Sequence, residues 1–158
     1  MRTAGTSRRD LSAPIAMAVT QLVDDSLKMC GIGKRQIRIE KELFVNPIIR
    51  ADRHRIYQVL VNLLRNALRA IDLVESHSDP TIRIRCTAAD DATICLSVSD
   101  NGIGMDQETR EKIFSMFFSS KGMEGTGLGM FIANKIAIKH EGRISVESTS
   151  GKGSRFLV

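Results

Sequence analysis

The sequence predicts an α/β fold, an α+β two-layer sandwich in which a sheet of about five or six strands is covered by about three helices. Apolar residues recur at helical spacing in some stretches and alternate with polar residues in others. The chain has 158 residues, of which 42% are hydrophobic, and this suits one compact domain with its own core. No apolar run approaches the roughly 20 residues that a membrane span requires.

The first predicted element is a helix that follows a polar leader. Residues 1–12 resemble a leader or the end of an upstream linker, so the domain is expected to span residues 13–158. Ser12 is a suitable N-cap and Pro14 suits a first helical turn. Apolar spacing then predicts a helix that ends near Gly31.

Two strands and the strongest helix come next. Alternating patterns predict strands over 36–43 and 47–51. Asp52 opens a long helix, which fades into a polar loop over 75–80. The apolar face of this helix comprises Ile56, Val59, Leu60, Leu63, Ala67, Leu68 and Ile71.

A β-hairpin follows, with Asp90 and Asp91 at its turn. The expected register pairs Ile82 with Val98, Ile84 with Leu96, and Cys86 with Ile94. Because side chains alternate along a strand, Cys86 faces the core and Cys95 the opposite side, so no disulfide joins them. An odd count of three cysteines also favours a reducing cytoplasm.

The pattern in the last third of the sequence predicts two helices, a mobile loop between them, and two closing strands. In order they are a helix over 106–114, a loop over 115–125, a helix over 127–139 that Gly142 ends, and strands over 143–148 and 154–158. Phe114, Phe117 and Phe118 are expected to anchor the near end of the loop.

The composition limits the kinds of molecule that the chain is expected to bind. Lys and Arg total 23 against 18 Asp and Glu, and the net charge of +5 suits an anionic partner such as a nucleotide or an acidic surface. The chain has no Trp and one Tyr, so it lacks the stacking platform of single-strand nucleic-acid binders. Most of these charges are expected to form a solvated surface.

A polar stripe runs along the long predicted helix. Gln58, Asn62, Asn66 and Arg69 fall near one line on the helix surface. Asparagine is a poor helix former, so two of them one turn apart require a reason. An Asn oxygen can bind Mg²⁺ without adding negative charge beside a triphosphate, and Arg69 could reach phosphate. Taken alone, an ordinary solvated helix face explains the stripe equally well.

Two glycine-containing segments also suit a nucleotide. Asp100–Gly104 ends a strand, and the Asp100 carboxylate, a pure acceptor when ionised, could bind the exocyclic amine of adenine. A simple turn is the alternative interpretation. Gly125–Gly129 leads into a helix, where backbone N–H groups favour phosphate. Its glycine spacing differs from the dinucleotide fingerprint, and no hydrophobic strand precedes it.

Taken together, four segments resemble the N, G1, F and G2 boxes of the histidine-kinase and gyrase-type ATPase superfamily. They are residues 58–67, 100–104, 113–121 and 125–129, in that order. The resemblance covers nearly the whole chain. It implies a Bergerat-type ATP-binding fold, with a mixed sheet covered on one face by helices and ATP held between the helix layer and a lid.

The resemblance also implies site roles. Asn66 would bind Mg²⁺, Asn62 and Arg69 would lie at the phosphates, and Asp100 would hold the adenine amine. Asn62 and Asn66 would be the catalytic residues. The other nucleotide contacts would be Gly102, Gly104, Lys121, Gly125, Thr126, Gly127, Leu128 and Gly129. Two departures from the family pattern are a short lid over 119–125 and Met116 in a place where Pro is frequent.

Asn62 separates the branches of this superfamily. Gyrase-type and chaperone ATPases usually have Glu there as a general base, whereas Asn cannot deprotonate water. The chain therefore most resembles the catalytic domain of a two-component sensor histidine kinase. That resemblance implies ATP and Mg²⁺ as cofactors, an upstream phosphoacceptor and dimerisation domain as partner, and a response regulator as an indirect one. It also implies a cytoplasmic domain without nucleic-acid or membrane contact, whose parent protein can be membrane-anchored.

Three alternatives stay open. They are a serine kinase of the anti-sigma-factor type, a nucleotide-binding regulatory module without catalysis, and a nucleic-acid-acting ATPase suggested only by the charge. The histidines available as acceptors are His54, His77 and His140, and each has a structural place in the predicted fold. None is expected to be the phosphoacceptor.

Overall fold

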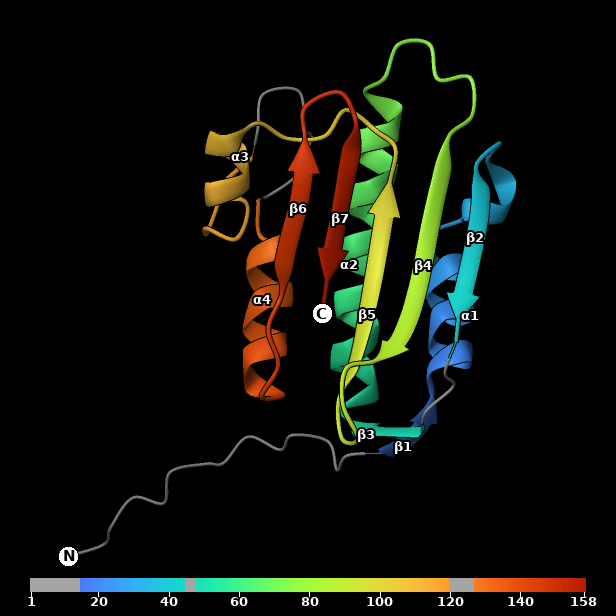
Figure 1. Ribbon diagram of the computed structural model, residues 1–158, viewed down its shortest axis with the longest axis vertical. Coiled ribbons are helices and arrows are strands. Elements are labelled where there is room, and N and C mark those ends of the chain that lie inside the picture. Colours follow the sequence, from blue (N-terminus) through green and yellow to red (C-terminus); the bar gives the residue numbers. More distant parts are fainter. Residues whose placement is uncertain (1–14, 45–47, 120–126) are drawn as a thin grey trace, which may run out of the picture.

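The computed structural model describes residues 15–44, 48–119 and 127–158, and it confirms the predicted two-layer α/β fold (Figure 1). The main sheet has five strands in the order β2-β4-β5-β7-β6. It is mixed, because β2 runs parallel to β4 and all other neighbours are antiparallel. Its strands are β2 (Arg38–Leu43), β4 (Thr81–Ala88), β5 (Ile94–Asp100), β6 (Ser145–Thr149) and β7 (Gly153–Leu157).

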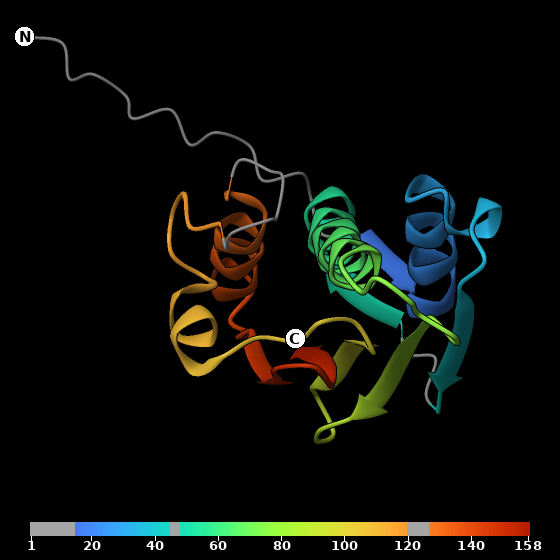
Figure 2. The same cartoon turned by 90° about the horizontal axis from the view of Figure 1, so that it is seen from above.

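Three helices cover one face of this sheet, as predicted (Figure 2). They are α1 (Val19–Met29), α2 (Arg53–Asp72) and α4 (Gly129–Lys139). The core lies between the layers, and its largest fully buried side chains include Leu22, Leu60, Leu63, Leu64, Ile82, Ile84, Val98 and Phe156. No helix in the described part of the chain is both long and apolar enough to cross a membrane.

Helix α2 forms where the sequence predicts it. Asp52 caps its N-terminus, because the Asp52 carboxylate accepts a hydrogen bond from the Arg55 amide at 3.2 Å. The helix lies between α1 and α4, so burial extends beyond the predicted apolar face to Val61 and Leu64. The shorter helix α3 (Gln107–Lys112) begins in the same manner, with an Asp106 cap on the Thr109 amide.

The predicted start of the first helix is wrong. Residues Ile15–Ala18 form strand β1, which pairs antiparallel with β3 (Ile48–Ala51) in a separate two-stranded sheet. Helix α1 begins only at Val19, without a side-chain cap. The apolar spacing suits either state, and the distant pairing partner decides between them. The expected N-cap, Ser12, and the leader over 1–12 lie outside the described residues.

The predicted hairpin exists, but its register is shifted by two residues. Cys86 pairs with Leu96 and Ala88 with Ile94. The reason lies in the turn, where the Asp90 carboxylate accepts a hydrogen bond from the Ala92 amide at 2.8 Å. With this turn, the centre of the hairpin lies closer to β5 than predicted. An even shift preserves the faces. Cys86 is therefore fully buried, whereas Cys95 is half-buried on the opposite side, as expected.

Helix α4 ends at Lys139, as predicted, but its start differs from the prediction. It begins at Gly129 rather than at residue 127. Just beyond its C-terminus, Glu141 has a positive φ of 60°. The Glu141 amide bonds to the Ile138 carbonyl at 3.0 Å and the Gly142 amide to the Ala137 carbonyl at 2.9 Å. This pair of bonds is a Schellman motif.

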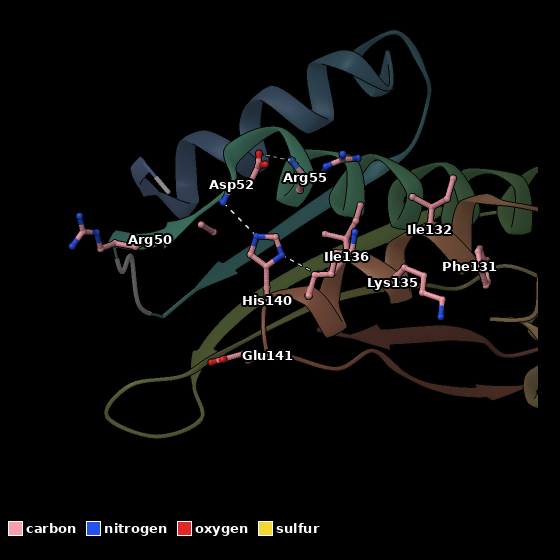
Figure 3. Close-up of a pocket in the computed structure, with 11 residues that line it drawn as sticks. Arg50, Asp52, Arg55, Phe131, Ile132, Lys135, Ile136, His140 and Glu141 are labelled. Atoms are coloured by element: carbon pink, nitrogen blue, oxygen red, sulfur yellow. Dashed lines mark hydrogen bonds between the residues drawn. The ribbon is translucent and has the colours of Figure 1, made fainter. Parts of the chain in front are cut away.

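His140 joins the end of α4 to the beginning of α2 (Figure 3). One ring nitrogen, Nδ1, lies 2.9 Å from the Ile136 carbonyl, which can only accept. The other, Nε2, accepts the Asp52 amide at 3.3 Å. The neutral ring with a proton on Nδ1 satisfies both bonds. His140 therefore connects two helices whose contacting residues lie 88 positions apart.

We expect His140→Ala to lower the free energy of unfolding by about 2 kcal/mol, because two partly buried hydrogen bonds are lost. Urea denaturation monitored by circular dichroism measures this change. His54→Ala is the control, because His54 is exposed on the first turn of α2 and its loss should change stability by less than about 0.5 kcal/mol. Equal stability of the two variants would contradict the structural role of His140.

Candidate functional site

A cavity of about 210 Å³ lies between α2, α3 and the turns that follow β5 and β6. It brings together segments from distant parts of the sequence. Its lining residues are Asn66, Ala70, Ile103, Gly104, Met105, Asp106, Thr109, Ile113, Ser150 and Ser154. Two of the predicted site residues, Asn66 and Gly104, therefore share one cavity.

Asp100 ends β5 next to this cavity. It pairs across the sheet with Ser154, a lining residue, and its own side chain is buried. Its Oδ1 accepts the Gly102 amide at 2.9 Å, but its Oδ2 is buried without a hydrogen-bond partner among the described residues. Burial raises the pKa of Asp100 to about 6, although the Gly102 and Ser154 amides act in the opposite direction. The carboxylate is thus placed to accept one further donor.

The glycines after Asp100 permit close backbone contacts. A Cβ atom at Gly102 would lie 2.3 Å from the Ala70 carbonyl carbon, so any larger residue would push the turn away from α2. Gly104 has a φ of +67°, and a Cβ atom there would lie 2.0 Å from the Thr149 carbonyl oxygen. The Ile103 amide also bonds to the Ala70 carbonyl at 3.0 Å. This turn is therefore fixed against α2 and the β6–β7 hairpin.

Ser148 supports residues that line the cavity, and sequence reasoning missed it. Its buried hydroxyl accepts the Met105 amide at 2.8 Å and lies 2.9 Å from the Gly153 carbonyl and 2.8 Å from the Ser154 hydroxyl. The Arg110 guanidinium donates to the Ser148 carbonyl at 2.8 Å. Nothing in the local sequence distinguishes Ser148 from other strand serines. Its role comes from long-range contacts that hold the cavity wall.

The four residues of the polar stripe on α2 lie in different environments. Asn66 is buried and lines the cavity. Asn62 is half-buried, and its amide donates to the Gly129 carbonyl at 3.0 Å, which ties α2 to the start of α4. Arg69 is exposed and Gln58 is half-buried, and neither lines the cavity. The stripe thus supplies one cavity residue and one link between helices.

Only part of the glycine-rich segment belongs to the described residues. Gly127 has a φ of +68°, and a Cβ atom there would lie 2.6 Å from the Phe117 carbonyl carbon. Leu128 is the N-cap of α4 and Gly129 is its first residue. The predicted contacts Lys121, Gly125 and Thr126 lie outside the described residues, as does most of the predicted lid.

The predicted aromatic anchor is correct only in part. Phe114 packs against Phe156 edge to face, with ring centroids 6.3 Å apart, and so joins the core. Phe118 is half-buried. Phe117 is instead 69% exposed, with a positive φ of 58°. Its backbone rather than its ring is what Gly127 approaches.

The sequence matches the family described as "Histidine kinase-, DNA gyrase B-, and HSP90-like ATPase" over residues 51–158. Among curated proteins, it is 34% identical over 148 residues to the signal transduction histidine-protein kinase AtoS of Escherichia coli (strain K12), covering 90% of this chain and 23% of AtoS. It is 35% identical over 147 residues to the sensor histidine kinase ZraS of the same strain, covering 90% of this chain and 30% of ZraS. The chain thus spans less than a third of these relatives.

Solved structures show the same fold. The catalytic domain of the histidine kinase ThkA, in a nucleotide-free form, superposes with a TM-score of 0.77 at 30% identity, covering 92% of this chain and 93% of that one. The mycobacterial sensor histidine kinase MprB superposes with a TM-score of 0.78 at 23% identity, covering 91% of this chain and 94% of the MprB chain. The predicted arrangement of sheet and helices is confirmed.

Proposed function

The chain belongs to the family of histidine kinase-, DNA gyrase B- and HSP90-like ATPases, as an ATP-binding catalytic domain of the sensor histidine kinase type, and from this premise we propose its reaction. It transfers the γ-phosphoryl group of Mg²⁺-ATP to a histidine on a separate upstream dimerisation domain. The observation that carries the proposal is the buried Asp100 carboxylate next to the cavity that Asn66 lines, because its Oδ2 has no hydrogen-bond partner in the described part of the chain.

In this proposal Asp100 accepts a hydrogen bond from the exocyclic amine of adenine. That bond would satisfy Oδ2 and relieve part of the cost of burying the charge. Gly102 keeps the turn close to α2 and Gly104 keeps it close to the β6–β7 hairpin, which leaves room for a flat base. Only a donor at this position satisfies the carboxylate, so the pocket favours adenine over guanine, which has a carbonyl there.

Asn66 would hold Mg²⁺ through its neutral amide oxygen. Phosphate oxygens and water would complete the shell, as is usual for Mg²⁺ with nucleotides. The ion, when bound, neutralises charge that develops on the phosphates. We assign Arg69, Lys121 and the segment Gly125–Gly129, including Thr126, Gly127 and Leu128, to the phosphate side.

Asn62 favours transfer to a protein rather than to water. Its amide cannot act as a general base, and its Nδ2 already donates to the Gly129 carbonyl. In the transfer, an imidazole nitrogen of the acceptor forms a bond to the γ-phosphorus while the bond from phosphorus to the β–γ bridging oxygen breaks. ADP leaves with that oxygen. The phosphohistidine would then supply a response regulator, and we place these steps in the cytoplasm.

We expect this chain alone to bind ATP without phosphorylating its own histidines. His77 contacts the Asn101 carbonyl at 2.8 Å through Nε2, and both ring nitrogens of His140 are engaged. His54 is exposed, but it lies two turns before Asn62 on the same rigid helix. Each side chain is thus tied to the domain that holds the nucleotide.

Incubation with γ-labelled ATP, with and without the dimerisation domain of the parent kinase, tests this. Acid-labile label is expected only on the added domain. Acid-labile label on His54, His77 or His140, at a rate comparable to the parent kinase, would contradict the proposal. Acid-stable label on a serine of an added protein would indicate a serine kinase instead.

A further inference from the structure

A second concave site lies at the opposite end of α2 from the nucleotide cavity. We name it the α2–α4 groove, and its lining side chains are drawn in Figure 3. Its volume is about 470 Å³. It is lined by Arg50, Ala51, Asp52, Arg55, Phe131, Ile132, Lys135, Ile136, Lys139, His140 and Glu141. It shares no lining residue with the nucleotide cavity.

The floor of the groove is apolar and preformed. Ala51 and Ile136 are buried, and Phe131 and Ile132 are half-buried beside them. His140 fixes the floor through its bonds to the Asp52 amide and the Ile136 carbonyl. A ligand body placed here would meet carbon atoms and no free hydrogen-bonding group of the histidine ring.

The rim of the groove is cationic. Arg50, Arg55, Lys135 and Lys139 are all exposed, and none forms an ion pair with another described residue. Most charged pairs of the described chain lie elsewhere, such as Arg83 with Glu40 on the outer face of the sheet. Lys135 instead lies over the Phe131 ring, with its Nζ 5.4 Å from the centroid. Two acidic residues also line the groove: Asp52, whose carboxylate accepts the Arg55 amide, and Glu141 at one end.

We propose that the α2–α4 groove is a binding site for a small organic anion with a flat apolar body. The body would cover the apolar floor, and its sulfonate, carboxylate or phosphate group would lie among the rim cations, chiefly Lys135 and Lys139. The volume falls within the range of small-molecule pockets, about 300–1,000 Å³. The α4 portion, from Phe131 to His140, is only about 15 Å long at 1.5 Å per residue, which suits two or three rings.

A protein helix is the less suitable occupant. A stable protein interface buries about 800 Å² on each partner, more than so short a groove provides alone. The groove also has a fixed floor, whereas its cations are on long flexible side chains that can close over a small anion. Size and rim charge therefore both point to a small ligand.

The probe is 1-anilinonaphthalene-8-sulfonate, whose fluorescence rises in apolar sites. Its neutral counterpart N-phenyl-1-naphthylamine has the same rings without the sulfonate. The whole chain is titrated with each in the presence of saturating ADP and Mg²⁺, which keeps the nucleotide cavity filled. We expect the anion to bind at least tenfold more tightly than the neutral compound, with ADP changing its Kd less than threefold.

A double variant locates the site. Lys135→Gln with Lys139→Gln should raise the Kd of the anion at least tenfold and leave that of the neutral compound within threefold. The control is Lys28→Gln with Lys34→Gln, two exposed lysines near the end of α1 that change the net charge equally. Nuclear magnetic resonance should show the Asp52 amide, which His140 contacts, shifting with the probe in the parent and control proteins.

Three results would overturn the inference. One is displacement of the anion by ADP, and another is equal weakening by the control variant. The third is that the dimerisation domain protects Lys135 and Lys139 from acetylation while the probe does not bind to the groove. The groove would then be a protein interface. Each of these differs from failure of the proposed kinase reaction, because none depends on phosphoryl transfer.

Discussion

Asn66→Ala is expected to reduce phosphoryl transfer to the separate dimerisation domain at least 100-fold while leaving the fold intact. Asn66 is a buried residue of the nucleotide cavity, and alanine has no oxygen to offer Mg²⁺. A bound metal contributes several kcal/mol of charge stabilisation, so its loss corresponds to about two orders of magnitude in rate or more. Alanine also has a higher helix propensity than asparagine, so α2 should not unfold.

Two further variants separate metal binding from general damage. Arg65→Ala removes the exposed neighbour of Asn66 on α2 and should change the rate less than threefold. Asn66→Asp keeps an oxygen ligand but adds negative charge beside the phosphates, so partial activity with a shifted Mg²⁺ dependence is expected. The measurement is the initial rate of labelled phosphoryl transfer across a Mg²⁺ titration. Equal rates for Asn66→Ala and the parent would remove Asn66 from the metal site.

Local signals in the sequence were enough to predict much of the fold. The periodicity of α2 and its Asp52 cap lie within a few turns, and the alternation of β4 and β5 marks a hairpin without knowledge of its partners. Asp100 and Gly104 are predicted as site residues in the same manner, because a carboxylate and glycines at a strand end are a local pattern. Four ordered segments then indicated the family, which the comparisons confirm.

Long-range contacts account for what could not be predicted. Strand β1 looks helical until β3 is available to pair with it, and the hairpin register depends on how Asp90 closes its turn. The contacts of Ser148 and His140 join segments that are distant in sequence. Periodicity reports the face on which a residue lies, but it does not report the atom that the residue contacts.

Asp100→Asn is expected to weaken the binding of ATP and yet to stabilise the ATP-free domain against unfolding. The asparagine amide has one acceptor oxygen and one donor nitrogen, whereas the carboxylate has two acceptor oxygens. The hydrogen bond from the adenine amine is therefore weakened if the amide oxygen faces it, and lost if the amide nitrogen faces it as a second donor. Hydrogen bonds to charged groups contribute about 1.5–3 kcal/mol, which corresponds to a loss of affinity of about 10-fold to 100-fold. Calorimetric titration with ATP and Mg²⁺ measures it.

The stability change has the opposite sign because burial raises the pKa of Asp100 from 3.8 to about 6. Ionisation therefore opposes folding, so the contribution of Asp100 to stability is greatest below pH 3.8 and is lost as the pH rises toward about 6. At pH 7 the full difference corresponds to about 3 kcal/mol, of which asparagine should recover about 2 kcal/mol. Thermal unfolding without nucleotide should thus show a higher Tm for the variant at pH 7, and a smaller difference at pH 5.

Nucleotide affinity should follow the same ionisation. Since the amine of adenine binds best to the charged carboxylate, the parent should lose affinity as the pH falls through about 6, the pKa of Asp100. The phosphates of the nucleotide titrate in the same range, so the quantity to plot is the ratio of Kd values for Asp100→Asn and the parent. That ratio should be largest above pH 6 and should approach 1 near pH 4.5, because a protonated carboxyl and an amide offer the same kinds of group. A ratio that stays constant with pH would show that the Asp100 carboxylate does not contact the base, even if the variant binds ATP weakly.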